Sequence, residues 1–225
     1  MRRQQLVIML KEPRPGRVKT RLGRDIGATA AAWWFRHQCA ALLRRLDDPR
    51  WQLTLAVSPD REGRASRIWP PHLPRLPQGT GDLGHRMERV FRTAPPGPVL
   101  IIGADIPGVT SRHIDTAFRA LGTHEAVLGP APDGGYWLIG LKRSRPVPPA
   151  LFENVRWSTP HAMEDTLRSL GPVRVAVTDV LHDIDTVADL DRLRSQPSPA
   201  PQSAACISRN RLAVRSNSKV PSPSR

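Results

Sequence analysis

The stretch that decides the fold is VLIIGADIPG, residues 99–108. Four consecutive aliphatic residues without polar alternation are typical of a strand that is covered on both faces, as in parallel sheets. Pro107 stops the strand, and Asp105 follows it directly. Ligands of open α/β sheets bind outside the carboxyl ends of the strands, and carboxylates ligate divalent cations. We therefore predict that Asp105 holds a metal ion, and the alternative is that it caps the helix that begins near Thr110.

Further apolar runs on either side of this strand predict a three-layer α/β fold with a mostly parallel sheet and helices on both faces. Strand, helix and strand follow one another over residues 6–57, which is the pattern of a right-handed βαβ unit. We expect strands at 6–10, 51–57, 126–130, 137–141 and 173–177, and helices at 27–46, 83–93 and 111–121. Residues 58–77 contain five prolines and predict no regular structure apart from a short edge strand at 73–76.

Length and charge suggest one domain with a basic tail. The chain has 225 residues and a formal charge of +14, of which residues 196–225 supply +5 with no acid. This tail is rich in Pro and Ser, so we expect it to be disordered and residues 1–195 to form the domain. The basic excess suits polyphosphate substrates or nucleic acid. No aromatic and basic RNA-binding motif and no zinc spacing accompany it, which argues against nucleic acid.

Cysteine usage and the N-terminal residues suggest a reducing compartment. Only Cys39 and Cys206 are present, which excludes a disulfide framework. Five apolar residues precede Lys11, fewer than a signal peptide requires, and no apolar run approaches the length of a membrane span. We predict a cytoplasmic protein without a membrane partner.

A cationic loop follows the first strand. Residues 11–22, KEPRPGRVKTRL, carry five cations. The pair Lys19-Thr20 suggests a phosphate-binding P-loop, but the two glycines of that motif are replaced by Pro13 and Val18. The loop could still bind a di- or triphosphate through backbone N–H groups and Lys19 or Arg21. The alternative is a solvated charged loop.

Two glycine-rich turns could also face a ligand. Glycines 79, 81 and 84 open the helix at 83–93 and would let backbone approach a ligand, although a plain helix entry explains them as well. The turn DGGY, residues 133–136, is a hairpin signal that is compatible with a substrate pocket. Residues 157–160, WSTP, predict the start of a helix with Ser158 or Thr159 as its cap.

A pair of carboxylates follows the last strand. Asp183 and Asp185 alternate across Ile184, so an extended backbone directs both side chains the same way. Together with Asp105 they could hold one or two Mg²⁺ or Mn²⁺ ions. The alternative is that Asp185 caps the following helix with Thr186.

Several motifs in this order resemble a bacterial family with the glycosyltransferase-A fold and largely unassigned function. They are KEP (11–13), GRVKTRL (16–22), GDLGHRM (81–87), GADIP (103–107), GP (129–130), DGGYW (133–137), WST (157–159) and DIDT (183–186). Some members of that family are called arsenosugar-biosynthesis-type glycosyltransferases. The family is similar to 2-phospho-L-lactate guanylyltransferase and, more distantly, to molybdenum-cofactor guanylyltransferase. The resemblance covers residues 6–194.

The resemblance implies a fold of the nucleotide-diphospho-sugar transferase type and a role for each motif. The residues implied in nucleotide binding are Leu10, Lys11, Gly16, Arg17, Lys19, Thr20, Arg21, Gly81, Asp82 and Arg86. Those implied in acceptor binding are Asp133, Gly134, Gly135, Tyr136 and Trp157, and those implied as metal ligands are Asp105, Asp183 and Asp185. Lys19, Arg21 and Asp105 are the expected catalytic residues.

We therefore expect a metal-dependent transferase that moves a glycosyl group from a nucleotide sugar to a small acceptor, with Mg²⁺ or Mn²⁺ as cofactor. The sequence Gly103-Ala104-Asp105 carries one acid where sugar-nucleotide transferases usually have Asp-x-Asp. This leaves nucleotidyl transfer from an NTP with release of pyrophosphate as an alternative. A non-catalytic nucleotide-binding protein and a basic nucleic-acid binder are further alternatives.

Overall fold

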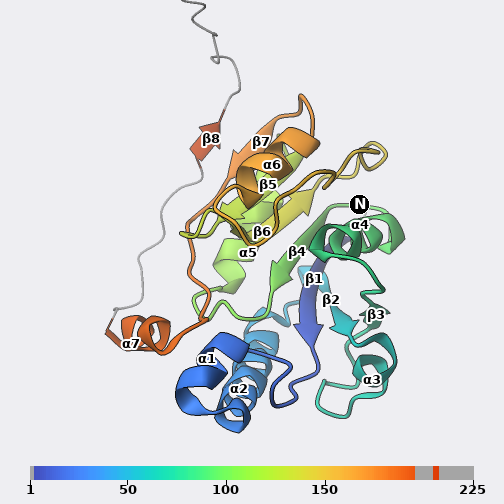
Figure 1. Ribbon diagram of the computed structural model, residues 1–225. Coiled ribbons are helices and arrows are strands. Elements are labelled where there is room, and N and C mark those ends of the chain that lie inside the picture. Colours follow the sequence, from blue (N-terminus) through green and yellow to red (C-terminus); the bar gives the residue numbers. More distant parts are fainter. Residues whose placement is uncertain (1–2, 196–204, 208–225) are drawn as a thin grey trace, which may run out of the picture.

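The computed structural model describes residues 3–195 and 205–207, which form one sheet with helices on both faces (Figure 1). The strands lie in the order β3-β2-β1-β4-β6-β5-β7-β8. Their bounds are β1 Gln4–Lys11, β2 Trp51–Ser58, β3 Arg75–Pro77, β4 Val99–Gly103, β5 Ala126–Pro130, β6 Tyr136–Leu141, β7 Val175–Val177 and β8 Ala205–Ile207. The helices are α1 Thr20–Ile26, α2 Ala28–Leu46, α3 Asp60–Ala65, α4 Leu83–Thr93, α5 Ser111–Ala120, α6 Ala162–Ser169 and α7 Val187–Ser195.

The sheet is mostly parallel, as the sequence predicts. β1 lies in the middle and pairs in parallel with both β2 and β4. β6 runs antiparallel between β4 and β5, and β5 pairs in parallel with β7. The predicted three-layer α/β class is therefore confirmed.

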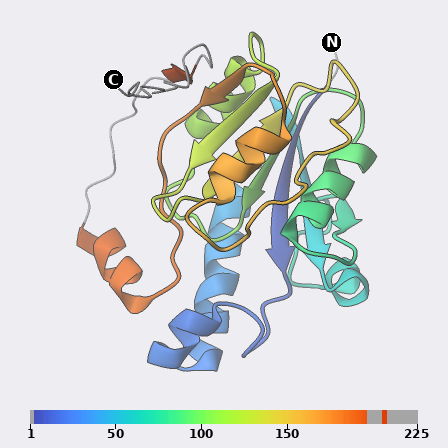
Figure 2. The ribbon, with the colours of Figure 1, turned by 45° about the horizontal axis from the view of Figure 1, so that its top comes forward.

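The uninterrupted aliphatic runs arise because successive side chains enter two different cores. In β4, Leu100 and Ile102 pack in the core beneath α2 and α5, whereas Val99 and Ile101 pack in the core beneath α4 and α6. All four residues are at most 2% exposed. Figure 2 shows α4 and α6 in front of the sheet and α2 behind it. A strand between two helical layers has no polar face, which is why β4 shows no alternation.

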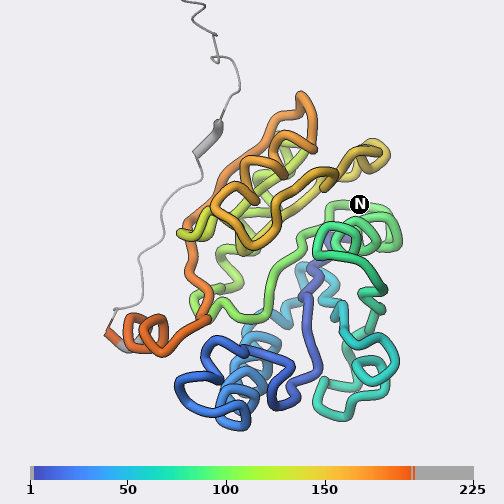
Figure 3. Tube along the Cα trace, in the orientation of Figure 1, coloured from blue at the N-terminus to red at the C-terminus, as the bar shows by residue number. Residues whose placement is uncertain are grey.

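Parallel pairing brings the carboxyl ends of β1 and β4 to the same edge of the sheet. Met9 pairs with Gly103, so Lys11 and Asp105 both leave the sheet at this edge. The segment after β7 returns past the same edge to reach α7, which contacts α1 (Figure 3). The loops after β1 and β4, the β5–β6 turn and the segment before α7 therefore meet there.

Three local predictions differ from the structure. Residues 20–22 begin helix α1 instead of continuing a loop; no side chain caps this helix, and fully buried Leu22 anchors it. The proline-rich segment contains helix α3, and its strand β3 begins at Arg75. Helix α6 begins at Ala162 and not near residue 157, because Ser158 adopts φ 59° and cannot continue a right-handed helix.

The expected disorder of residues 196–225 falls mostly outside the described residues. Of this segment the structure describes Ala205–Ile207, which form β8 against β7 and so differ from the expectation. β7 is otherwise an edge strand, whose unpaired backbone groups can accept an added strand. Among the described residues, every helix is too short or too polar to cross a membrane.

Candidate functional site

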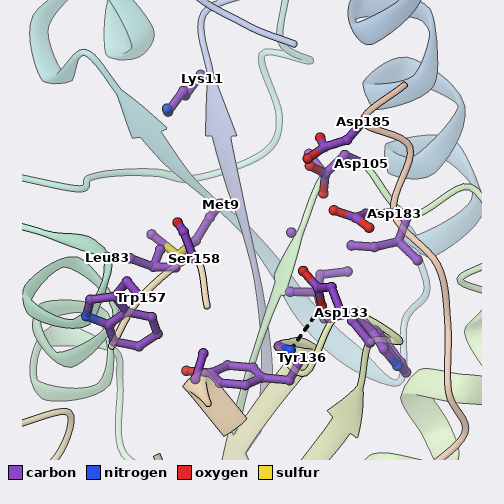
Figure 4. A pocket seen from close by; sticks show the side chains of 18 of the residues that line it. Met9, Lys11, Leu83, Asp105, Asp133, Tyr136, Trp157, Ser158, Asp183 and Asp185 are labelled. Atoms are coloured by element: carbon purple, nitrogen blue, oxygen red, sulfur yellow. Dashed lines mark hydrogen bonds between the residues drawn. The ribbon is translucent and has the colours of Figure 1, made fainter. Parts of the chain in front are cut away.

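A pocket of about 800 Å³ opens at the carboxyl ends of β1 and β4. Its walls come from the loop after β1, the start of α4, the loop after β4, the β5–β6 turn, residues 157–160 and the segment before α7. Figure 4 shows the aspartates on one side of this pocket and Met9, Leu83 and Trp157 on the other. The pocket contains most of the predicted site residues.

Asp105 lies where the sequence predicts, directly beyond β4. A side chain at Gly103 would place its Cβ 2.9 Å from Asp105 Oδ1, so glycine leaves room for the carboxylate beside the strand. The Asp105 carbonyl oxygen accepts a hydrogen bond of 3.1 Å from Ile184 N. Because Ile184 is itself buried, this bond fixes the later acidic segment against the end of β4.

The three predicted metal ligands meet. Asp105, Asp183 and Asp185 each offer one carboxylate oxygen, and these oxygens all lie within 4.8 Å of one another. The alternative role of Asp185 as a helix cap does not fit, because Asp189 Oδ2 accepts from Thr186 N at 2.9 Å and from Thr186 Oγ1 at 2.8 Å. The Asp185 carboxylate instead accepts hydrogen bonds from the loop after β1.

Lys19 is the cation that neutralises this cluster. Its Nζ donates to Asp105 Oδ2 and to Asp185 Oδ1, both at 2.7 Å, and its side chain is 5% exposed. Burial lowers the pKa of Lys19, but the charges and hydrogen bonds of the two aspartates outweigh it and raise the pKa overall. Arg21 Nη1 adds a contact of 3.2 Å to Asp185 Oδ2 from an exposed position.

Asp183 has the most perturbed carboxyl group of the cluster. Burial raises its pKa to about 6, and the charges of Asp105 and Asp185 act in the same direction. Like charges that are held together in a partly dry site resist ionisation. A cation placed among these three carboxylates would reverse that effect.

The β5–β6 turn forms the end of the pocket that carries Tyr136, and the charge of its Asp133 acts on Asp183. Asp133 Oδ1 accepts a 2.9 Å hydrogen bond from Gly135 N (Figure 4). Gly134 has φ 84°, and a side chain there would collide with the backbone of Pro160. The Tyr136 hydroxyl accepts from Thr166 Oγ1 at 3.3 Å, which ties the turn to α6.

Trp157 is the main aromatic surface of this end. Its ring lies against Gly84, where an added Cβ would come within 2.8 Å of Trp157 Cζ2. Its ring centre is 5.8 Å from that of Phe152 and 6.4 Å from that of Tyr136. The ring is thus held on several sides and still lines the pocket.

The residues implied in nucleotide binding divide into two groups. Leu10, Lys11, Arg17, Lys19, Thr20 and Arg21 line the pocket. Gly16, Gly81, Asp82 and Arg86 do not: Asp82 caps α4 by accepting from His85 N, and Arg86 donates to Gly81 O, Ser58 Oγ and Gln78 Oε1. Among the acceptor residues, Asp133, Gly135, Tyr136 and Trp157 line the pocket and Gly134 shapes its turn.

Sequence reasoning missed Gln78. This side chain is 3% exposed, and its Nε2 donates to Leu10 O at 3.0 Å and to Ala56 O at 2.7 Å. These two hydrogen bonds join β1 and β2 beside the pocket. A glutamine that follows a short strand and precedes a glycine gives no sign of this role.

The fold and the pocket define a protein of the nucleotide-diphospho-sugar transferase fold. A candidate nucleotide-diphospho-sugar transferase from Desulfovibrio desulfuricans G20 is 30% identical, with 87% of each chain covered and a TM-score of 0.75. The chain belongs to the DUF2064 family, described as uncharacterized proteins conserved in bacteria, whose model matches residues 41–159. No curated protein matches the chain.

More distant solved structures share the fold alone. Rv0371c from Mycobacterium tuberculosis H37Rv, which has been solved in complex with manganese, is 17% identical in that structure, with 86% of this chain and 98% of that chain covered and a TM-score of 0.52. CMP:2-keto-3-deoxy-manno-octonic acid synthetase in complex with CTP is 12% identical, with the same coverage and a TM-score of 0.54.

Proposed function

We propose that this chain is a metal-dependent transferase that uses a nucleotide-activated donor and moves a glycosyl group from a nucleotide sugar to a small acceptor. The observation that carries the proposal is the cluster of three carboxylates facing a cationic loop within one pocket. The family relative named as a candidate nucleotide-diphospho-sugar transferase supports the choice of donor.

The three carboxylates of the cluster are suitable ligands for a divalent cation. Three carboxylate oxygens within 4.8 Å of one another are ligands that Mg²⁺ and Mn²⁺ prefer. The ammonium of Lys19 lies between two of them, so the space among the carboxylates already accommodates positive charge. A bound Mg²⁺ or Mn²⁺ ion would supply charge that neutralises the diphosphate of the donor.

The loop after β1 would bind the phosphates of the donor. Lys11, Arg17, Lys19 and Arg21 are the four cations that line the described pocket; Lys11 ends β1, Arg17 and Lys19 lie in the loop, and Arg21 lies in the first turn of α1. Arg21 is 67% exposed at its side chain and can turn from Asp185 toward a ligand at little cost. These cations would stabilise the negative charge that develops on the leaving diphosphate.

The acceptor would enter from the side of Tyr136 and Trp157 and displace the nucleotide directly. Among the described lining residues there is no cysteine, and Ser158 and the threonines have no histidine partner in the pocket that could activate them. Direct displacement by the bound acceptor is therefore the simplest course. The presence of all three aspartates argues against a binding protein that has lost its chemistry.

Nucleotidyl transfer is the second candidate, because a single acid at Asp105 replaces the Asp-x-Asp of sugar-nucleotide transferases. The two reactions leave different products. Incubation with radiolabelled UDP-sugars or with NTPs would release a nucleoside diphosphate in the first case and pyrophosphate in the second. The cytoplasmic location and the lack of a nucleic-acid partner stay predictions.

The experiment that tests the proposal is thermal unfolding of the full chain with nucleotides, with and without Mg²⁺ or Mn²⁺. A ligand at about 100 times its Kd adds about 2.7 kcal/mol, which raises the Tm of a chain of this size by several degrees. Asp105→Asn should abolish the metal-dependent part of this rise and keep the fold. Asp115→Asn is the matched control, since Asp115 pairs with Arg50 and Arg119 on the surface. The proposal is wrong if no nucleotide raises the Tm of the parent chain with either metal.

A further inference from the structure

We propose that the acceptor is an uncharged hydroxyl compound with an apolar or aromatic face, bound against Trp157, Tyr136 and Leu83. This inference rests on the proposed function and adds the chemical class of the second substrate. It excludes phosphorylated and carboxylated acceptors.

Positive and negative side chains occupy different parts of the pocket. All four lining cations lie within residues 11–21, at the end that would hold the donor phosphates. Apart from these cations and the three clustered aspartates, Asp133 is the one charged side chain among the lining residues that the structure describes. An anionic acceptor would meet Asp133 without a counter-ion of its own, because the cations would contact the donor phosphates and the metal ion would lie among the three clustered aspartates. Like charges repel each other, so Asp133 would weaken the binding of an anionic acceptor.

The part of the pocket proposed to bind the acceptor is lined by apolar and aromatic side chains. Tyr136, Trp157, Leu83, Met87 and Met9 line the pocket and form its apolar wall, in which the rings of Tyr136 and Trp157 are 6.4 Å apart. Leu83 is 46% exposed although it is a large apolar residue at the first turn of a helix. Aromatic rings bind flat apolar faces, including the C–H faces of sugar rings. The wall therefore suits a neutral ligand with one apolar side.

The segment around Trp157 has a costly backbone conformation, which points to a ligand-binding role. Phe152, Asn154 and Ser158 have φ values of 67°, 57° and 59°, a region that residues with side chains rarely adopt. Such conformations persist only where the surroundings enforce them, and they cluster at ligand sites. Two contacts hold this segment against α6: Phe152 N donates to Ser169 Oγ at 3.0 Å, and Asp165, which is 2% exposed at its side chain, accepts from Arg156 N, Nε and Nη2.

Two matched probes test the inference: phenyl β-D-glucopyranoside and the same compound carrying a 6-phosphate. Saturation-transfer NMR would measure their binding to the full chain in the presence of Mg²⁺ and UDP. We expect the glucoside to bind at least about tenfold more tightly than its phosphate, a difference of about 1.4 kcal/mol. Equal or tighter binding of the phosphate overturns the inference, and so does the absence of saturation transfer to the glucoside.

Variants assign the binding to the aromatic wall. Trp157→Ala should abolish binding of the glucoside, Trp157→Phe should retain it, and Trp33→Ala is the control because Trp33 is 60% exposed on α2 and does not line the pocket. Leu83→Arg adds a cation to the wall and should bring the binding of the 6-phosphate to within about twofold of that of the glucoside. Unchanged binding of the glucoside by Trp157→Ala overturns the inference.

The stabilisation by Mg²⁺ and UDP separates this inference from the proposed function. Trp157→Ala should leave that stabilisation intact. If the variant loses it as Asp105→Asn does, Trp157 belongs to the nucleotide subsite, and the inference falls while the proposed function stands. The proposed function itself fails if no nucleotide stabilises the parent chain, whatever the glucoside does.

Discussion

Replacing Lys19 by Met should tighten the binding of Mn²⁺ and weaken that of a nucleoside diphosphate. Methionine keeps an unbranched apolar stem in a position that is 5% exposed, but it removes the ammonium that contacts Asp105 and Asp185. A divalent cation among the same carboxylates is repelled by that ammonium. The phosphates of a donor, in contrast, are attracted by it. The two affinities should therefore change in opposite directions.

The size of the first effect follows from Coulomb's law. A unit charge and a double charge about 4 Å apart repel by about 2 kcal/mol in water and by about 8 kcal/mol at an effective dielectric constant of 20. The side chains of Asp105 and Asp185 are 31% and 36% exposed, so the value for water is the better guide. Lys19 can also move aside when a metal ion binds. We therefore expect Mn²⁺ to bind at least about tenfold more tightly, which is 1.4 kcal/mol.

The assay is titration of Mn²⁺ into the full chain without nucleotide, followed by the electron paramagnetic resonance signal of the free ion. Arg21→Met is the matched control, because Arg21 contacts Asp185 at 3.2 Å from a position that is 67% exposed. Its removal should change the affinity by less than about 0.5 kcal/mol. An unchanged or weaker Mn²⁺ affinity in Lys19→Met would refute the assignment of these aspartates as the metal site.

Three further predictions concern the contacts that hold the site. Asp185→Asn should lower the stability of the metal-free chain by about 1 kcal/mol, because Lys19 loses one of its two partners. The variant should also lose the Mg²⁺-dependent rise in Tm with nucleotide, and a full rise would contradict the role of Asp185 as a metal ligand. Hydrogen bonds from Arg156 hold the pKa of Asp165 well below its usual range, so the stability they contribute is present above about pH 4 and is lost as the pH falls below that value. Between about pH 4 and pH 2, the free energy of unfolding measured in urea should accordingly fall less in Asp165→Asn than in the parent chain. Equal decreases in the two chains would refute this role of Asp165. Gly134→Ala should lower the free energy of unfolding in urea by about 1–3 kcal/mol more than Gly16→Ala does. Both glycines have positive φ, but of the two only Gly134 lies against a backbone, that of Pro160. An equal loss of stability in the two variants would contradict this.

The meeting of the three aspartates could be predicted from sequence because local patterns determine where each of them lies. The aliphatic run before Asp105 fixes a buried strand and its end, and the spacing of Asp183 and Asp185 directs both side chains one way. The contacts of Lys19 carry no such pattern. They join residues 86 and 166 positions apart, and Lys19 begins a helix without any side-chain cap. Only the tertiary packing of α1, through Leu22, places its ammonium in the cluster.

The WSTP segment misled the sequence analysis for a related reason. Ser or Thr followed by Pro is a sound signal for a helix start, and the local preference alone would begin α6 there. The ring of Trp157 instead packs on Gly84, and Arg156 forms an ion pair with Asp165 in α6. These two contacts fix the segment outside the helix. Tertiary contacts override local preference at this point, which is common where a site requires an unusual backbone.

The reversed direction of β6 explains why the proposed acceptor subsite lies beside the proposed metal site. A strand parallel to β4 would begin at the opposite edge of the sheet, far from Asp105. Because β6 is antiparallel and Leu138 pairs with Ile102, its first residue Tyr136 lies level with the end of β4. Because β5 runs in the same direction as β1, the β5–β6 turn that carries Asp133 falls at the same edge as the cationic loop after β1. The antiparallel strand β6 thus brings the aromatic wall and the cluster of carboxylates into a single pocket.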